Sequence, residues 1–223
     1  MTDKEKAQKR YFWRKWIECP PAIFRKLYYR GVFRIKEPDG ARTIYLTFDD
    51  GPIPESTPWV LDTLDRYGVK ATFFMVGDNV RRYPHLYEEV RRRGHQVGNH
   101  TMHHLRGSHV TTGRLVKDVE EAAGWIDSRL FRPPHGWMRA RQTEKINRRY
   151  RIIMFDLVTR DYSSLLKAED VVNNVKKYAR PGSIVVFHDS LKSIPRIREA
   201  LPESLEWLLE QGYEFRVLEP RKK

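Results

Sequence analysis

Two short segments of the sequence together carry side chains that could bind a divalent metal ion. The segment Thr47 to Pro52 contains the consecutive carboxylates Asp49 and Asp50, and a later segment contains His100 and His104. A catalytic zinc site typically uses three nitrogen or oxygen ligands and leaves its fourth position to water. Water bound there becomes a usable nucleophile near neutral pH. The two segments therefore supply three ligands and one spare acid that could act as a base.

The local spacing supports this interpretation, although each segment has a simpler alternative. Neighbouring side chains near a strand end point in different directions, so one carboxylate could bind a cation while the other transfers a proton. Asp-Gly-Pro is also favourable turn chemistry, and a plain turn is the alternative. His100 and His104, four residues apart, share one face of a helix or turn and could bind one ion, unless the spacing is chance. His103, offset by one position, should form another hydrogen bond or face the solvent.

Further ionisable residues are candidates for the same site. Arg132 precedes two prolines and could pair with the free acid and keep it ionised, although a surface salt bridge is the alternative. His188 follows an apolar run and could donate a proton to a leaving amine, or it could be a buried core histidine. Asp161 and Asp156 could each orient His188, and spacing alone does not separate them.

The pattern of apolar residues predicts the elements that position these side chains. After Gly40, short β-branched or aromatic runs alternate with helical runs, as in a fold built from βα repeats. Strands are expected around Tyr45, Phe73, Val97, Phe131, Ile153, Val185 and Phe215. Helices are expected over Thr57 to Tyr67, with Thr57 as the cap and Gly68 at the end, and from Thr112 to Asp127. The sequence therefore predicts an α/β fold, an incomplete (β/α) barrel with about seven parallel strands.

In such barrels the chemistry lies where strands end and loops begin. Ionisable residues stand at or beyond the carboxyl ends of five predicted strands: Asp49 and Asp50, His100, Arg132, Asp161 and His188. Because the carboxyl ends of parallel strands meet at one rim, we expect these side chains to lie close together.

The composition narrows the remaining possibilities. The only cysteine is Cys19, so neither an intrachain disulfide nor a thiolate zinc site can form. No long apolar run and no signal-peptide core is visible, so the cytoplasm is the expected compartment. The net charge of +13 admits an anionic partner. We favour a solvated basic surface without a specific nucleic-acid site, because the basic residues are spread along helical faces and no nucleic-acid module is recognisable.

The 223 residues are expected to form one main domain, residues 41–223, after a basic and aromatic extension, residues 1–40, that packs on it. The turn signal Pro38-Asp39-Gly40 ends this extension. Peripheral contact of the extension with a membrane surface is the alternative, although Pro20-Pro21 interrupts any long amphipathic run. The sequence does not indicate an oligomeric state.

Five motifs give the chain a family resemblance. It resembles the NodB-like polysaccharide deacetylases, in particular a short bacterial branch whose first motif is Thr-Phe-Asp-Asp-Gly-Pro. The resemblance spans residues 43 to 218, and the motifs occur in the family's order: Thr47 to Pro52, His100 to His104, Arg132 to Gly136, Asp161-Tyr162 and Phe187-His188-Asp189. Five ordered motifs are far more specific than any one of them.

The resemblance implies a distorted (β/α) barrel that removes acetyl groups from N- or O-acetylated sugars with the help of a metal. Peptidoglycan, chitin-type glycans and acetylated xylan are the expected substrates. The implied roles are metal ligation by Asp50, His100 and His104, proton abstraction by Asp49, an ion pair from Arg132 to this base, and proton donation by His188 with Asp161 behind it. One divalent ion is expected, most readily Zn²⁺, with Co²⁺, Ni²⁺ or Mn²⁺ as alternatives.

Two residues depart from the family pattern. Tyr162 stands where the family usually has Trp, which changes the packing around the acid. His135 stands where the family usually has Tyr, which changes a side chain of the substrate cleft. The backbone N–H of His135 is retained, and in the family this group helps to bind the oxyanion.

Two other functions remain alternatives. The same fold could hydrolyse a small non-sugar amide, since a fold does not determine its substrate. A non-catalytic basic module could bind a glycan or nucleic acid, but such a module has no need of three metal ligands together with Asp49 and His188.

Overall fold

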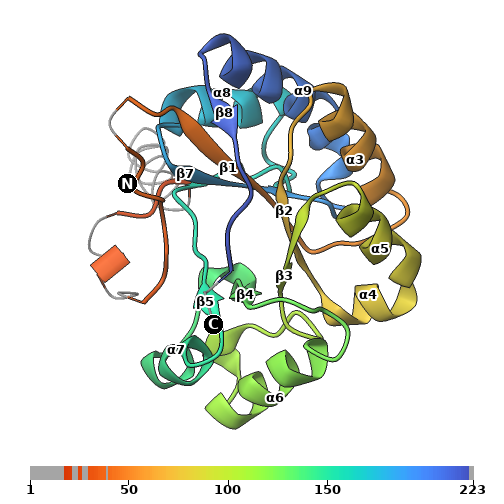
Figure 1. Cartoon of the computed structure of the whole chain (residues 1–223), viewed down its shortest axis with the longest axis vertical. Coiled ribbons are helices and arrows are strands. Elements are labelled where there is room, and N and C mark those ends of the chain that lie inside the picture. Colours follow the sequence, from red (N-terminus) through yellow and green to blue (C-terminus); the bar gives the residue numbers. More distant parts are fainter. Residues whose placement is uncertain (1–17, 22–24, 27–29, 39, 221–223) are drawn as a thin grey trace, which may run out of the picture.

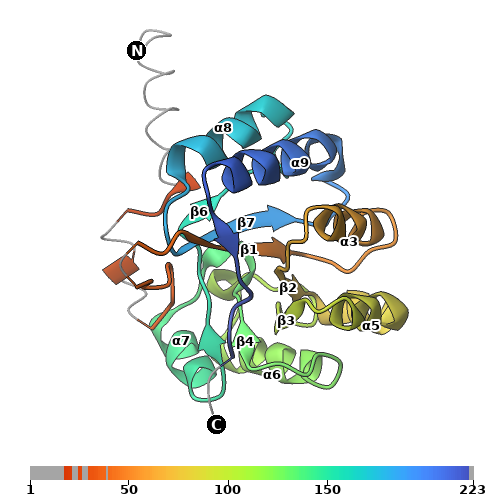
Figure 2. The same cartoon turned by 45° about the horizontal axis from the view of Figure 1, so that its top comes forward.

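The computed structural model describes residues 18–21, 25–26, 30–38 and 40–220, which form a curled sheet surrounded by helices (Figures 1 and 2). In this part of the chain the strands are β1 (Thr43–Asp49), β2 (Thr72–Met75), β3 (Gln96–Asn99), β4 (Leu130–Phe131), β5 (Arg151–Ile152), β6 (Leu157–Val158), β7 (Ser183–His188) and β8 (Glu214–Phe215). They follow the order β5-β4-β3-β2-β1-β7-β6, with β8 beside β1, and the pairings are parallel. The predicted incomplete (β/α) barrel is confirmed.

The helices lie outside the curled sheet (Figure 1). They are α3 (Thr57–Arg66), α4 (Gly77–Arg82), α5 (Pro84–Arg92), α6 (Thr112–Ala122), α7 (Ala140–Asn147), α8 (Ala168–Tyr178) and α9 (Ile194–Glu210), with the short 3-10 turns η1 (Gly107–His109) and η2 (Pro134–Gly136). Among the described residues, no helix combines the length and the apolar character that a membrane crossing requires.

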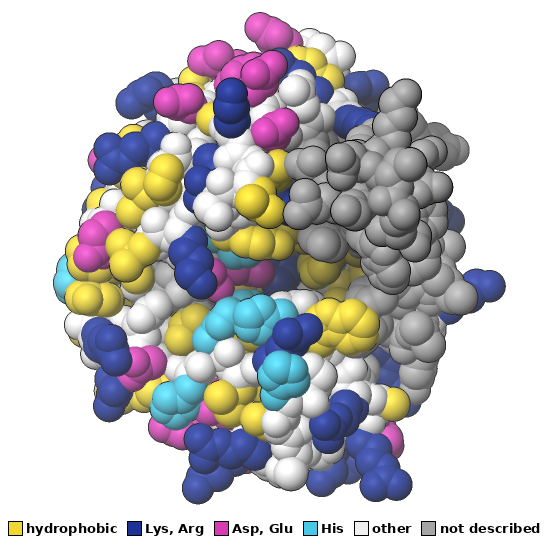
Figure 3. Space-filling model, turned by 180° about the vertical axis from the view of Figure 1, so that it is seen from behind, with side chains coloured by type: hydrophobic (Ala, Val, Ile, Leu, Met, Phe, Trp, Pro, Cys, Tyr) yellow, Lys and Arg dark blue, Asp and Glu magenta, His cyan; other side chains and the backbone are white. Residues whose placement is uncertain are grey.

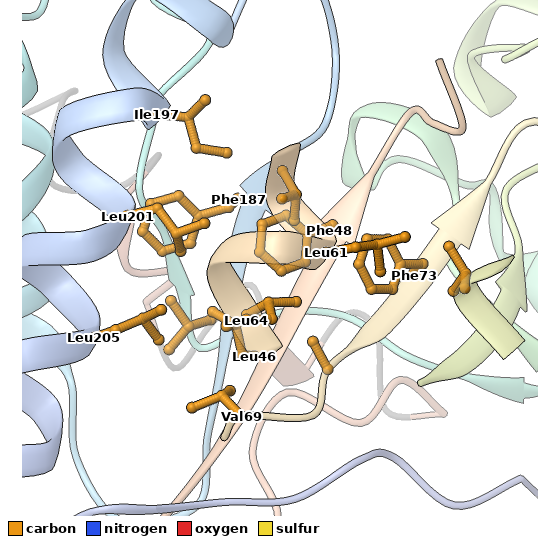
Figure 4. Packing of buried hydrophobic residues seen from close by; sticks show 14 of the residues in the cluster. Leu46, Phe48, Leu61, Leu64, Val69, Phe73, Phe187, Ile197, Leu201 and Leu205 are labelled. Atoms are coloured by element: carbon orange, nitrogen blue, oxygen red, sulfur yellow. The ribbon is translucent and has the colours of Figure 1, made fainter. Parts of the chain in front are cut away.

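The largest apolar core lies between the sheet and the outer helices (Figure 4). Leu46 and Phe48 of β1 pack in this core, whereas Tyr45 belongs to a separate cluster with residues of β2, β4 and β7. Successive side chains of a strand alternate between its two faces, so Thr47 and Asp49 share the inner face with Tyr45. The apolar pattern of β1 therefore directs Asp49 into the barrel interior.

The predicted strands agree closely with the observed ones. Six of the seven predicted centres lie within strands, and Ile153 lies just past β5, where it pairs with Val32. The sequence pattern missed β6, because the two residues Leu157–Val158 are too few to give a periodic signal. This omission matters for the site, because Asp156 and Asp161 lie on either side of β6.

The start of α3 differs from the prediction. Ser56 occupies the N-cap and Thr57 is the first helical residue, so the expectation that Thr57 caps the helix is wrong. The Thr57 hydroxyl accepts a hydrogen bond from the Ile53 amide at 2.8 Å and donates one to the Asp189 carboxylate at 2.7 Å. This hydroxyl therefore ties the helix to the end of β7 instead of closing the first turn.

The predicted end of α3 agrees with the structure, whereas the predicted end of α6 does not. Gly68, with a φ of +64°, follows α3 as expected. The helix α6 ends at Ala122, five residues before the predicted end at Asp127. The chain leaves the helix at a turn containing Gly124, and Ile126 stays buried outside the helix. Because Ile126 is apolar and lies at helical spacing, the sequence pattern predicted a helix end that lies beyond the observed one.

The described residues of the predicted extension contact the barrel. Phe33 is buried in a core cluster, Arg25 forms an ion pair with Asp156 at 2.6 Å, and Glu18 forms one with Arg160 at 3.1 Å. The membrane contact considered for this extension falls largely on residues outside the described ranges. The boundary at residue 40 stays a prediction.

Candidate active site

The two carboxylates at the end of β1 face different surroundings. Asp49 is the last residue of the strand and is buried in the barrel interior. Asp50 has a φ of +83°, in the left-handed region that glycine adopts far more readily than other residues. This backbone turn separates the two side chains, and the Asp50 carboxylate points toward two histidines.

The structure brings the three predicted metal ligands together. The Asp50 Oδ1 atom lies 3.1 Å from Nε2 of His104 and 3.8 Å from Nε2 of His100. One potential ligand atom from each residue lies within 4.8 Å of the other two. His100 directly follows β3, and His104 has a φ of +54°, so a turn rather than a helix places the two imidazoles side by side.

The protonation of these groups suits a divalent ion. The Nδ1–H of His100 donates to the Arg132 carbonyl at 2.8 Å, which leaves the Nε2 lone pair free. Burial lowers the pKa of His100 to about 4, so the ring is neutral at physiological pH. Burial raises the pKa of Asp50, but the hydrogen bond to His104 and the nearby histidine charges outweigh it and hold this pKa below its usual range. A carboxylate with two imidazoles is a typical zinc donor set.

His103 points away from this cluster, as predicted. Its Nδ1 atom lies 2.6 Å from Oδ1 of Asp118 on α6, and its side chain is half exposed. The Oδ2 atom of Asp118 accepts hydrogen bonds from the amides of Met102 and His103 at 2.9 and 3.1 Å. A buried carboxylate on α6 therefore anchors the segment that carries the two converging histidines.

Arg132 forms an ion pair with Asp49 inside the barrel. Its Nη1 atom donates to Oδ1 of Asp49 at 2.6 Å and to the Thr47 hydroxyl at 2.8 Å, and Nη2 donates to the Met154 carbonyl at 2.9 Å. Its guanidinium carbon also lies 4.1 Å from the centre of the Phe74 ring. The surface salt bridge considered from sequence is excluded, because Arg132 is 1% exposed.

Asp161, not Asp156, contacts His188. The Asp161 carboxylate accepts hydrogen bonds from Nδ1 and from the backbone amide of His188, each at 2.7 Å. Burial lowers the pKa of His188, but the charge and hydrogen bond of Asp161 outweigh it and raise this pKa to about 9. Asp156 instead accepts hydrogen bonds from Arg25 and Arg180 at 2.6 to 2.8 Å.

The two residues that depart from the family pattern lie beside these groups. His135 has a φ of +59°, and its ring lies edge-on to His104 with 4.8 Å between ring centres. Tyr162 is 37% exposed and lies edge-on to His188 at 4.9 Å. On the face seen in Figure 3, histidine side chains gather at the edge of a hollow that contains acidic side chains. Ring contacts therefore link His135 to His104 and Tyr162 to His188.

Two residues without a predicted role also hold the site. The Asn79 side-chain amide donates to the Asp50 carbonyl at 2.8 Å. Asp189 accepts hydrogen bonds from the Gly51 amide at 3.0 Å and from Thr57. Burial raises the pKa of Asp189 to about 7, while these two donors oppose the rise. Asp189 belongs to the fifth motif but had no role assigned from the sequence, and no sequence signal marked Asn79.

The sequence matches the family model described as polysaccharide deacetylase over residues 36–152. It is 37% identical to a peptidoglycan-N-acetylglucosamine deacetylase of Bacillus cereus over 186 residues, which cover 80% of this chain and 87% of that protein. It is 35% identical to a chitooligosaccharide deacetylase of a Bradyrhizobium species over 158 residues, which cover 67% of this chain and 72% of that protein.

Two solved structures of related enzymes have a fold similar to that of this chain. The crystal structure of the Bc1960 peptidoglycan N-acetylglucosamine deacetylase superposes with a TM-score of 0.75 at 28% identity, covering 83% of this chain and 89% of that one. The carbohydrate esterase domain of a xylanase from the hindgut metagenome of Trinervitermes trinervoides superposes with a TM-score of 0.71 at 30% identity, covering 80% and 88%. The chain therefore belongs to the polysaccharide deacetylase family and is an enzyme that acts on acetylated carbohydrate.

Proposed function

We propose that the enzyme hydrolyses the N-acetyl group of N-acetylglucosamine residues in a glycan of the peptidoglycan or chitin type, with one divalent metal ion. The observation that carries this proposal is the convergence of Asp50, His100 and His104 beside two ion pairs. Asp49 with Arg132 forms one of these pairs, and His188 with Asp161 forms the other. The relatives named as deacetylases of peptidoglycan and chitooligosaccharide support the choice of substrate.

In this proposal Asp50, His100 and His104 hold the metal ion. The neutral His100 ring and the ionised Asp50 carboxylate are in the states that metal ligation requires. Zinc is the first candidate for this donor set, with cobalt, nickel or manganese as alternatives. A divalent ion bound there would lower the pKa of a water molecule and polarise the acetyl carbonyl.

Asp49 acts as the general base of the proposed reaction. The Arg132 guanidinium lies 2.6 Å from Oδ1 of Asp49 and holds this carboxylate in a fixed orientation. Asp49 accepts a proton from the attacking water, and the backbone N–H of His135 donates a hydrogen bond to the developing oxyanion.

His188 acts as the general acid and donates a proton to the departing nitrogen. An amine leaves poorly without a proton, so the acid must be protonated at the working pH. The raised pKa of His188 meets this requirement and favours N-deacetylation. Asp161 holds the imidazole through Nδ1, so Nε2 is the atom that carries the donated proton. In this proposal Tyr162, which is exposed beside His188, contacts the sugar ring.

An acetate assay over a substrate panel tests this function. The panel contains chito-oligosaccharides, peptidoglycan fragments and acetylated xylan, and elemental analysis of the same protein identifies the bound metal. Acetate released from the first two substrates by metal-loaded protein is the expected result. Ammonia released from small amides instead would support the alternative hydrolase. Salt-dependent retention of DNA or anionic glycan, with no metal and no acetate, would support the non-catalytic binding module.

A further inference from the structure

The backbone at Asp50 is strained, and its surroundings hold it in place. A φ of +83° is unfavourable for aspartate and persists only where neighbouring contacts enforce it. The peptide groups on the carboxyl side of Asp50 are tied at several points. Its carbonyl accepts from Asn79 at 2.8 Å, and the Gly51 carbonyl accepts from the Val76 amide at 2.9 Å. These two contacts come from Asn79 in α4 and from Val76, the residue between β2 and α4.

Asp189 supplies the opposing contacts from the end of β7. Its Oδ1 atom accepts from the Gly51 amide at 3.0 Å, and its Oδ2 atom accepts from the Thr57 hydroxyl at 2.7 Å. Its own backbone amide donates to the Asp49 carbonyl at 3.1 Å. Asp189 is 1% exposed, so these bonds lie out of competition with water. The carboxylate therefore spans the turn that follows Asp50.

The Asp189 carboxylate packs directly against the backbone of Gly51. A Cβ atom added to Gly51 would lie 2.0 Å from Oδ2 of Asp189 and 2.5 Å from its Cγ. Such a close approach between a carboxylate and a backbone is possible only because residue 51 is glycine. The side chain of Asp189 therefore determines where the peptide group after Asp50 can lie.

We propose that Asp189 is a positioning residue that holds Asp50 in the conformation that presents its carboxylate to His100 and His104. The inference rests on the proposed function, because it concerns the ligand set assigned there. Asp189 acts on Asp50 through the Gly51 amide, and the Thr57 hydroxyl holds the Asp189 carboxylate in the orientation that this bond needs. Removing its hydrogen bonds lets the turn relax toward ordinary φ values and moves the Asp50 carboxylate away from the imidazoles.

The test measures zinc affinity of the full chain by competition with a chromophoric chelator, so it does not depend on activity. Asp189→Ala should weaken zinc binding about 10- to 100-fold, as expected when a residue that orients a metal ligand is removed. Asp189→Asn should stay close to wild type, because its carbonyl can accept from Gly51 while its amide donates to Thr57. Val175→Ala creates a cavity in the core where α8 packs, and it is the control for general destabilisation.

Each result bears on the inference. Wild-type affinity in Asp189→Ala, an equal loss in Val175→Ala, or an equal loss in Asp189→Asn would overturn it. If Asp189→Ala does not fold, Thr57→Val removes one of the two donors while keeping the side-chain shape. It should weaken zinc binding about 10-fold, and unchanged affinity would overturn the inference. A wild-type protein that binds no zinc would instead contradict the proposed function itself.

Discussion

Replacing Asp161 by asparagine tests the proposed proton donor directly. Both carboxylate oxygens of Asp161 accept hydrogen bonds from His188, one from the ring and one from the backbone. Asparagine keeps the shape of the side chain but loses the negative charge, and only one of its two terminal atoms can accept a hydrogen bond. We therefore expect the Asp161→Asn protein to fold, with a His188 that no longer holds its proton at neutral pH.

The size of the effect follows from the pKa of His188. Burial lowers this pKa, yet the charge and hydrogen bond of Asp161 raise it from 6.5 to about 9. Because one pKa unit is worth about 1.4 kcal/mol, the protonated ring is favoured by roughly 3 kcal/mol. Without the Asp161 charge the effect of burial remains, so the pKa should fall from about 9 to below the ordinary value of 6.5. The kcat near neutral pH should then fall about 10²- to 10⁴-fold.

The assay is the pH profile of kcat for acetate release from an N-acetylated chito-oligosaccharide. A general acid is active below its pKa and loses activity as the pH rises through it. The alkaline limb of the profile should therefore move to lower pH in Asp161→Asn. Asp156→Asn is the matched control, because Asp156 is also buried but binds Arg25 and Arg180. It should destabilise the fold and leave the alkaline limb in place.

An unchanged kcat and an unchanged alkaline limb in Asp161→Asn would refute the assignment of His188 as the proton donor. A shift of the limb in Asp156→Asn, but not in Asp161→Asn, would show that the wrong carboxylate was chosen. A dication bound beside Asp50 would lower the pKa of His188 in every variant. The quantity to measure is therefore the difference between variants in the pH of the alkaline limb.

Three further predictions concern the base, the metal and the stability of the fold. Asp49→Asn should retain zinc but release acetate about 10²- to 10⁴-fold more slowly, whereas His100→Ala should lose both; full turnover by Asp49→Asn would contradict its role. Dialysis against a chelator should abolish acetate release and added zinc should restore it; activity that survives complete metal removal would exclude metal dependence. His95→Asn should flatten the loss of thermal stability between pH 6.5 and 4. Burial and the Lys70 charge lower the pKa of His95 to about 4, so in this window the unfolded chain binds a proton that the folded chain does not. The free energy of unfolding of the wild type should fall by at most about 3 kcal/mol in this window. Equal slopes of Tm against pH in the two proteins would show that His95 does not cause this loss.

Much of the fold could be predicted because its signals are local. The apolar runs around Tyr45, Phe73 and Val185 gave the central strands, since buried parallel strands read as continuous apolar segments. In (β/α) barrels the active site lies at the carboxyl ends of the strands, and this rule predicted that the ionisable residues lie together at one rim. The end of α6 was predicted too late, because the spacing of Ile126 fits a helix that the chain has already left.

The partner of His188 could not be predicted, because the choice depends on β6. Asp156 precedes this two-residue strand and Asp161 follows it, so they lie toward opposite ends of the sheet. Parallel pairing with β7 places Asp156 beside Ser183 at the start of that strand, and Asp161 beside His188 at its end. A strand too short to show in the sequence thus decided which carboxylate reaches the histidine.

The sequence by itself determined the residue types of the site, their order along the chain and the parallel α/β architecture, because apolar periodicity and strand ends are properties of neighbouring residues. The tertiary structure alone decided which groups meet. It turned Asp50 toward His100 and His104 through a positive φ, and it placed Asp189 against Gly51. Such contacts join residues far apart in the chain, and their distances depend on strand register and loop conformation that no local pattern encodes.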